Sequence, residues 1–132
     1  MREERPMIYC YQDRKGNLPI IDWLEEVAHQ EKSTYQKMLH TLSQMQEKTL
    51  PLERPLVKKT PKQRTGYNNL YKMRLGNYRL FFQVEQQDYY LLHAFYKKTQ
   101  ATPEKEFRQV KKEMKAQSFV EIPKKIIKLI ES

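Results

Sequence analysis

Two kinds of hydrophobic spacing divide this chain into a helical first part and a β-rich middle part. Residues 8–11 form a short apolar run typical of a strand, and the turn-forming stretch 13–17 follows it. Two segments between residues 19 and 48 then carry apolar side chains at helical spacing, and these are Ile20, Ile21, Leu24 and Val27, followed by Tyr35, Met38, Leu39, Leu42 and Met45. We expect Asn17 to cap the first helix and Pro19 to lie in its first turn. The pattern predicts an antiparallel helical hairpin with one apolar side.

The middle of the chain changes to a period of two. Prolines 51, 55 and 61 disfavour a helix and predict that residues 49–65 form a loop across the surface. Strands are expected over 70–75, 78–84 and 89–96, and the turns Gly76-Asn77 and 86–88 join them into an antiparallel meander. On the third strand, alternation assigns Leu91, His93 and Phe95 to one face, opposite Tyr90, Leu92, Ala94 and Tyr96.

Two further helices are expected after the meander. Thr102-Pro103-Glu104 has the composition of a helix start, with a hydroxyl cap, and Phe107, Val110 and Met114 form its apolar side. Residues 116–132 are expected to form an extra C-terminal helix after Pro123, or an ordering tail. The order β-α-α-β-β-β-α-α predicts an α+β fold, in which the helices pack on one face of a small, twisted, mainly antiparallel sheet. A length of 132 residues fits one domain over 1–132.

Charge is concentrated in one part of the sequence. The net charge is +9, and residues 57–80 carry seven Lys or Arg without a single Asp or Glu. Such a block favours polyanions and indicates nucleic acid, although a solvated basic surface is the ordinary alternative. The lone Cys10 excludes a disulfide within the chain, and no apolar run approaches the roughly 20 residues of a membrane span. We therefore expect a cytoplasmic protein without a membrane partner.

The basic residues of the meander are suited to phosphate chemistry. Alternation places Lys72 and Arg74 on one strand face, with Arg79 across from them and His93 available from the third strand. Fixed cations on a concave sheet can hold a phosphodiester and stabilise the charge that develops during its cleavage. The sequence contains no Asp cluster for Mg²⁺, so no metal or other cofactor is expected. Metal-free cleavage by an adjacent 2′-OH requires RNA.

Two groups of candidate site residues follow. The candidates for catalysis are Lys72, Arg74, Arg79, His93 and Lys97. The candidates for RNA binding are Lys58, Lys59, Lys62, Arg64 and Lys98. We expect the two strand arginines to grip the scissile phosphate, while one of His93, Lys72 or Lys97 takes the 2′-OH proton. A histidine in an apolar strand is also commonly a partly buried structural side chain.

Several of these stretches resemble a known family. The stretches 70–82 and 91–100, with Thr102-Pro103, resemble the HigB-type, phage-derived branch of the RelE/ParE toxin superfamily. The opening Tyr11, Asp13, Gly16, Pro19 and Trp23-Leu24 and the loop Pro55, Val57 and Lys58 are similar as well. The likeness extends over about residues 8–115, and the His-x-Phe-x-Lys-Lys-Thr-x-x-Thr-Pro stretch is its most specific part.

The resemblance implies a RelE-like fold and a toxin of a type II toxin–antitoxin pair. Such toxins cut mRNA in the ribosomal A site, are neutralised by a helix-turn-helix HigA-like antitoxin, and reach operator DNA only within that complex. Arg74 and Arg79 match the family's strand arginines, and His93, Lys97 and Lys98 match its His-x-Phe-x-Lys-Lys run.

Some features depart from the HigB pattern. Lys72 stands where many HigB-like chains have an acid and is more similar to RelE, and the connection 60–69 is longer than usual. A ParE-like gyrase inhibitor and a basic RNA-binding module without catalysis are the alternatives, because the fold does not fix the activity.

Overall fold

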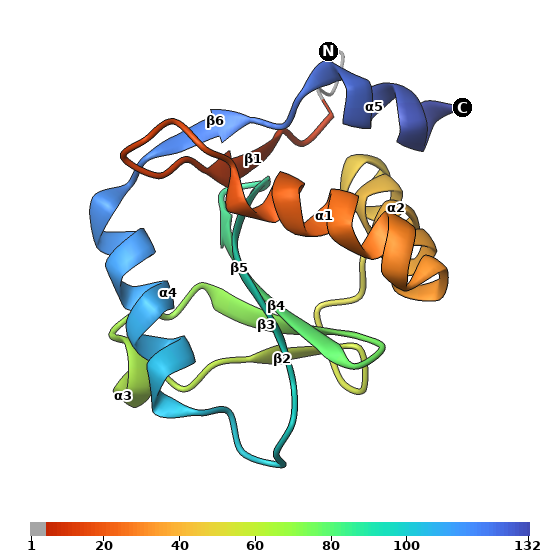
Figure 1. Cartoon of the computed structure of the whole chain (residues 1–132). Coiled ribbons are helices and arrows are strands. Elements are labelled where there is room, and N and C mark those ends of the chain that lie inside the picture. The colour runs from red at the N-terminus through yellow and green to blue at the C-terminus, as the bar shows by residue number, and fades with distance from the viewer. Residues whose placement is uncertain (1–4) are drawn as a thin grey trace.

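The computed structural model describes residues 5–132 and has the α+β architecture expected from the sequence (Figure 1). In chain order its elements are β1 (Ile8–Tyr11), α1 (Pro19–Gln30), α2 (Lys32–Glu47), β2 (Val57–Lys59), α3 (Lys62–Thr65), β3 (Leu70–Leu75), β4 (Tyr78–Glu85), β5 (Asp88–Tyr96), α4 (Glu104–Ala116), β6 (Phe119–Glu121) and α5 (Lys124–Glu131). The helical hairpin, the three-strand meander and the two later helices are confirmed. None of the helices within residues 5–132 is both long and apolar enough to cross a bilayer.

The strands form one mixed sheet in the order β2-β3-β4-β5-β1-β6. The β1–β5 pair is parallel and the other pairs are antiparallel, so the sheet is mainly antiparallel, as predicted. The N-terminal strand lies beside the last strand of the meander because α1 and α2 carry the chain across the sheet before the meander begins. β6 then pairs with β1, so the chain after residue 116 extends the sheet before it forms α5.

The prediction of a loop over residues 49–65 was wrong for its second half. Val57–Lys59 forms edge strand β2, antiparallel to β3, and Lys62–Thr65 forms the single turn α3. Pro55 precedes the strand and Pro61 follows it, so neither proline removes a hydrogen bond from the ladder. Pro61 occupies the N-cap of α3, which a proline tolerates.

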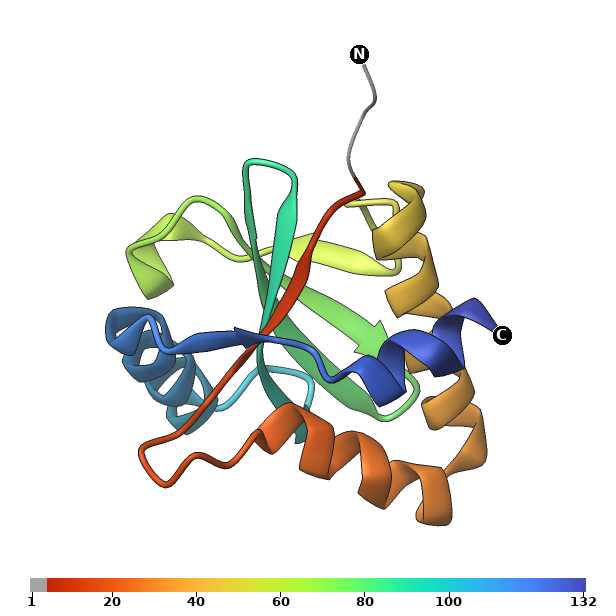
Figure 2. The same ribbon diagram turned by 90° about the horizontal axis from the view of Figure 1, so that it is seen from above.

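A large apolar core fills one face of the sheet, beneath α1, α2 and α5 (Figure 2). The helices contribute the residues that their spacing predicted, including Leu24, Val27, Met38, Leu42 and Met45. The sheet contributes Met73, Leu75, Leu80, Phe82 and Leu91 from the meander. Burial of apolar area of this kind is the main stabilising contribution in a domain of this size.

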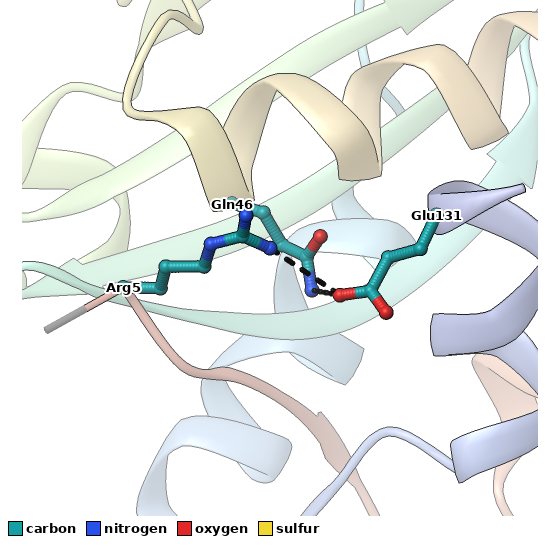
Figure 3. Close-up of polar contacts among 3 residues, drawn as sticks. All are labelled: Arg5, Gln46 and Glu131. Atoms are coloured by element: carbon teal, nitrogen blue, oxygen red, sulfur yellow. Dashed lines mark hydrogen bonds and ion pairs between the residues drawn. The ribbon is translucent and has the colours of Figure 1, made fainter.

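The C-terminal helix is attached to this core by Ile126, by the partly buried Ile127 and Ile130, and by polar bonds at its end. Ile126 is buried in the core, while Glu131 Oε2 accepts bonds from Arg5 Nη1 at 3.3 Å and Gln46 Nε2 at 3.5 Å (Figure 3). These bonds join α5 to α2 and to the segment before β1.

The prediction that all helices pack on one face was wrong. α4 lies on the opposite face from α1 and α2, as Figure 2 shows, and its residues Phe107, Val110 and Met114 form a second, smaller core. The sheet contributes Leu70, Phe81, Leu92 and Phe95 to this core. Because these side chains are apolar, this part of the second face of the sheet also requires a cover.

A β-bulge changes the phase of the third meander strand. The register shifts beside Phe81 and Phe82, so Phe81 pairs with His93 while Phe82 pairs with Leu91. Leu92 is the extra residue, and Leu91 therefore faces the large core while Leu92 and Phe95 face α4. The assignment of Leu91 to the same face as His93 was wrong. Strict alternation assumes one residue per position along the strand, and the extra residue Leu92 breaks this alternation between Leu91 and His93.

The two predicted side-chain caps are absent. Leu18 and Pro103 occupy the N-cap positions of α1 and α4, and neither makes a side-chain capping bond. Asn17 instead donates its backbone N–H to Asp13 Oδ1, which closes the preceding turn. The hydroxyl of Thr102 is consequently available for another partner.

Candidate functional site

A hollow of about 600 Å³ lies on the α4 face of the sheet, where α4 does not cover the strands β2, β3 and β4. Its other walls are α3, the segment before β2, the start of α4 and the connection from β5 to α4. The cationic side chains that line it are Arg54, Lys58, Arg64, Lys72, Arg74, Arg79 and Lys97. No Asp or Glu belongs to the lining formed by the described residues.

The strand register explains why so many cations meet here. Lys58 on β2 is the cross-strand neighbour of Lys72 on β3, and Arg74 is the neighbour of Arg79 on β4. Lys97 follows β5, and its backbone N–H donates to Asn77 O at 2.8 Å, which holds it beside the β3–β4 turn. Like charges directly across a sheet repel, so an anion bound between these side chains would stabilise the arrangement.

Arg79 is held in a defined orientation by the turn that precedes it. Its Nη1 donates to Gly76 O at 3.0 Å and to Tyr78 O at 2.8 Å. Both bonds use one nitrogen of a guanidinium that carries five N–H donors, so further donors can contact a ligand. Burial, followed by the charge of Arg74, lowers the pKa of Arg79 from its ordinary value.

Lys72 is the most perturbed cation of the hollow. Its pKa is lowered from 10.5 to about 8, first by burial and then by the charges of Lys97, Lys58, Arg79 and Arg64. Its Nζ donates a hydrogen bond to Thr102 Oγ1 at 2.6 Å. An amine with this pKa has an accessible neutral form near neutral pH and can act as a general base.

Arg64 forms a fixed wall of the hollow. Its Nη2 lies 2.8 Å from Glu104 Oε2, and its Cζ lies 4.3 Å above the centroid of the Phe107 ring. α3 and the start of α4 therefore hold one side of this guanidinium while the residue lines the hollow. The sequence could not indicate this contact, since its partners lie some forty residues later in the chain.

The structure brings together only part of the predicted set. Lys72, Arg74, Arg79 and Lys97 meet in the hollow, together with the predicted RNA-binding residues Lys58 and Arg64. The other RNA-binding candidates, Lys59, Lys62 and Lys98, are exposed and do not line it.

His93 lies outside the hollow. Its Nε2 is 2.8 Å from Glu106 Oε1, both side chains are largely buried, and its ring stacks on Phe95. His93 is the cross-strand neighbour of Phe81 on the face that α4 covers, and Glu106 in the first turn of that helix can reach it there. The structure therefore does not bring His93 together with the cationic side chains of the hollow.

Arg54 and Thr102 are among the residues lining the hollow that were not predicted as site residues. Arg54 was not singled out because it lies in the first 56 residues, where acidic side chains outnumber basic ones by one. Thr102 was interpreted as a helix cap, although its place in the most specific stretch of the family resemblance was an available signal.

The site offers cations and no evident metal ligands. Within residues 5–132, no group of three His, Cys, Asp or Glu side chains is placed to hold a metal ion. Converging guanidinium and ammonium groups can bind a phosphate and stabilise the negative charge that grows on it in a transition state.

Comparisons with known proteins bear on most of the chain. Two YoeB–YefM toxin–antitoxin structures from Staphylococcus aureus contain a chain of similar fold. The first, a heterotetrameric complex, shows 14% identity and a TM-score of 0.48, and covers 71% of this chain and 99% of that chain. The second shows 15% identity and a TM-score of 0.47 with the same coverage. No curated protein sequence matches.

The match to a family model is more extensive. The model described as "Phage derived protein Gp49-like (DUF891)" matches residues 22–115, which include every residue lining the hollow. The expectation of a phage-derived family is thereby confirmed. This chain belongs to the Gp49-like family of phage-derived proteins.

Proposed function

We propose that this protein is the toxin of a type II toxin–antitoxin system and cleaves mRNA on the ribosome without a metal ion. The observation that carries the proposal is the hollow itself, where seven Lys or Arg side chains meet without an acid among its lining residues. The HigB resemblance of the same strands supports the choice of RNA and of the ribosome, and it supports a helix-turn-helix antitoxin as partner.

The geometry supports a division of roles in cleavage. Arg74 and Arg79 contact the non-bridging oxygens of the scissile phosphate, because they are cross-strand neighbours and Arg79 is fixed by its turn. The 2′-OH of the preceding ribose attacks phosphorus, and neutral Lys72 accepts its proton. The bond to the 5′-oxygen of the next nucleotide breaks, and protonated Lys97 donates a proton to that oxygen. The products are a 2′,3′-cyclic phosphate and a 5′-hydroxyl.

The proposal is tested by growth arrest on expression, combined with mapping of new mRNA 5′ ends on purified, programmed ribosomes. We expect Arg79→Ala to reduce single-turnover cleavage by about 100-fold or more, as is typical for loss of one transition-state donor. Lys128→Ala, which removes an exposed cation from α5, is the matched control and should cleave at the normal rate.

The same experiment separates the alternatives. If Arg79→Ala still arrests growth and still truncates the message, the assignment of the hollow fails. If the unaltered protein yields no new 5′ ends, cleavage is excluded; inhibited DNA supercoiling would then favour a gyrase inhibitor, and blocked translation alone would favour an RNA-binding module.

His93 provides a further check on the placement of the site. Because His93 contacts Glu106 and not the hollow, we expect His93→Gln to keep the cleavage rate within about threefold at a temperature where it is folded. A loss comparable to that of Arg79→Ala would return His93 to the catalytic group.

A further inference from the structure

We propose that Thr102 is a positioning residue for the general base, because its hydroxyl oxygen holds the Lys72 amine at the place where the attacking 2′-OH must lie. This inference rests on the proposed function and adds to it a residue outside the set of cations. It concerns one hydrogen bond, from Lys72 Nζ to Thr102 Oγ1 at 2.6 Å.

The hydroxyl is free for this bond because Thr102 does not cap α4. Pro103 occupies the N-cap, and no side chain makes a capping bond there. Thr102 is partly buried and lines the hollow. It directly precedes Pro103, the N-cap of α4, so the helix fixes the position of its backbone. Lys72 reaches it from the middle of β3, some thirty residues earlier in the sequence.

Lys72 needs such an anchor because its other neighbours repel it. The charged groups that face it are Lys58 from β2, Arg64 from α3, Arg79 from β4 and Lys97 after β5, and each of them lowers its pKa. Lysine has a flexible four-carbon stem, so repulsion alone would leave its amine in many orientations. A hydroxyl oxygen is the neutral acceptor that fixes one of them.

A hydroxyl is also chemically better suited to this place than a carboxylate. A carboxylate would favour the ammonium form of Lys72, raise its pKa and compete with the phosphate for the surrounding cations. Thr102 accepts a hydrogen bond from the amine without adding charge, so Lys72 is oriented while its neutral form stays accessible.

The test is the pH dependence of single-turnover cleavage for the complete protein on programmed ribosomes. In the unaltered protein the rate should rise towards a plateau with an apparent pKa near 8, because the neutral form of Lys72 is the base, and it should fall again at the higher pH where Lys97 loses its proton. Thr102→Val keeps the shape but removes the acceptor. We expect a plateau at least about tenfold lower and an apparent pKa about one unit lower, because the ammonium form loses its hydrogen bond.

Two further variants separate positioning from a general disturbance of the loop. Thr102→Ser keeps the hydroxyl and should stay within about threefold of the normal rate with an unchanged profile. Thr99→Val removes the bond from Thr99 Oγ1 to Ala101 O in the same connection, and it should leave the apparent pKa unchanged. Thr102→Ala replaces Thr102→Val if the valine variant does not fold.

A second measurement does not depend on cleavage. The pKa of Lys72 can be read by NMR from the ¹³Cε shift of labelled lysine in the free protein, with Lys72→Met identifying the signal. A lower pKa in Thr102→Val than in the unaltered protein shows that Thr102 holds the Lys72 amine; if no RNA is cut at the same time, the failure lies in the proposed function and not in this contact. An unchanged Lys72 pKa in Thr102→Val, or a Thr102→Ser variant as slow as Thr102→Val, overturns the inference.

Discussion

The two faces of the sheet use the same strands for opposite purposes. On β3, Met73 and Leu75 point into the large core, whereas Lys72 and Arg74 line the hollow on the other face. On β4, Leu80 points into the large core and its neighbour Arg79 lines the hollow. One face is fully closed by α1, α2 and α5, while the other is closed by α4 at one end only (Figure 2).

This difference indicates how the protein supports an unfavourable site. Seven cations around one hollow repel each other and destabilise the folded state when no anion is bound. The large core on the opposite face supplies apolar burial that offsets this repulsion, through strands shared by both. We therefore expect that substitutions at adjacent positions of one strand can lower the free energy of unfolding without changing RNA binding, or weaken RNA binding without changing the free energy of unfolding.

The largest expected effect comes from two neighbours on β3. Met73 is fully buried, so Met73→Ala should lower the free energy of unfolding by about 2–5 kcal/mol through lost burial and a cavity. Arg74 is exposed, so Arg74→Ala should change it by no more than about 0.5 kcal/mol while weakening RNA binding. Urea unfolding measures the first quantity and RNA titration the second. Equal losses of stability in the two variants would contradict the separation of the faces.

The core beneath α4 contains a carboxyl group, and this gives a pH-dependent prediction. Glu113 is 2% exposed, its Oε1 has no hydrogen-bond partner among the described residues, and its Oε2 accepts a bond from Gln109 at 2.8 Å. Burial raises the pKa of Glu113 from 4.5 to about 7, against the smaller lowering effect of the Gln109 bond. The ionised form is therefore disfavoured in the fold, and stability is lost as the pH rises from about 4.5 to above 7.

We expect Glu113→Gln to be more stable than the unaltered protein by about 3 kcal/mol at pH 8, with the difference vanishing near pH 4. Urea unfolding at both pH values measures it, with Glu121→Gln, an exposed acid on β6, as the control. A stability difference that does not depend on pH would show that Glu113 is not the group responsible.

The smallest expected effect concerns the end of α5. Arg5 and Glu131 form an ion pair with side chains 63% and 46% exposed (Figure 3), so Arg5→Ala should change the free energy of unfolding by less than about 0.5 kcal/mol. Ile126→Ala should cost about 2–3 kcal/mol, because this side chain is buried in the large core. If removal of Arg5 costs as much as removal of Ile126, polar contacts stabilise the attachment of α5 as strongly as burial does.

Local sequence patterns predicted most of the elements and the pairing within the meander, but not the other strand pairs or the face on which α4 packs. Helical spacing located α1, α2, α4 and α5, and alternation with Gly76-Asn77 located the β3–β4 hairpin. The short strands β2 and β6 were missed. Each has only three residues, which is too few for an alternation of apolar and polar side chains to be recognised without knowing the neighbouring strand. The face of α4 was also missed, since a bulge at Leu92 changes which side of β5 is apolar.

The sequence by itself determined the α+β class, the basic character of the meander and the identity of six of the seven cations that meet in the hollow. The class of fold follows from the spacing of apolar residues along the chain, and the basic character follows from the number of nearby Lys and Arg. Both can be read from residues that are neighbours in the sequence. Only the tertiary structure decided that Arg54 and Thr102 belong to the site, that His93 pairs with Glu106 outside it, and that the pKa of Lys72 falls to about 8. Those properties depend on burial and on contacts between residues far apart in the chain, and a one-dimensional pattern contains neither.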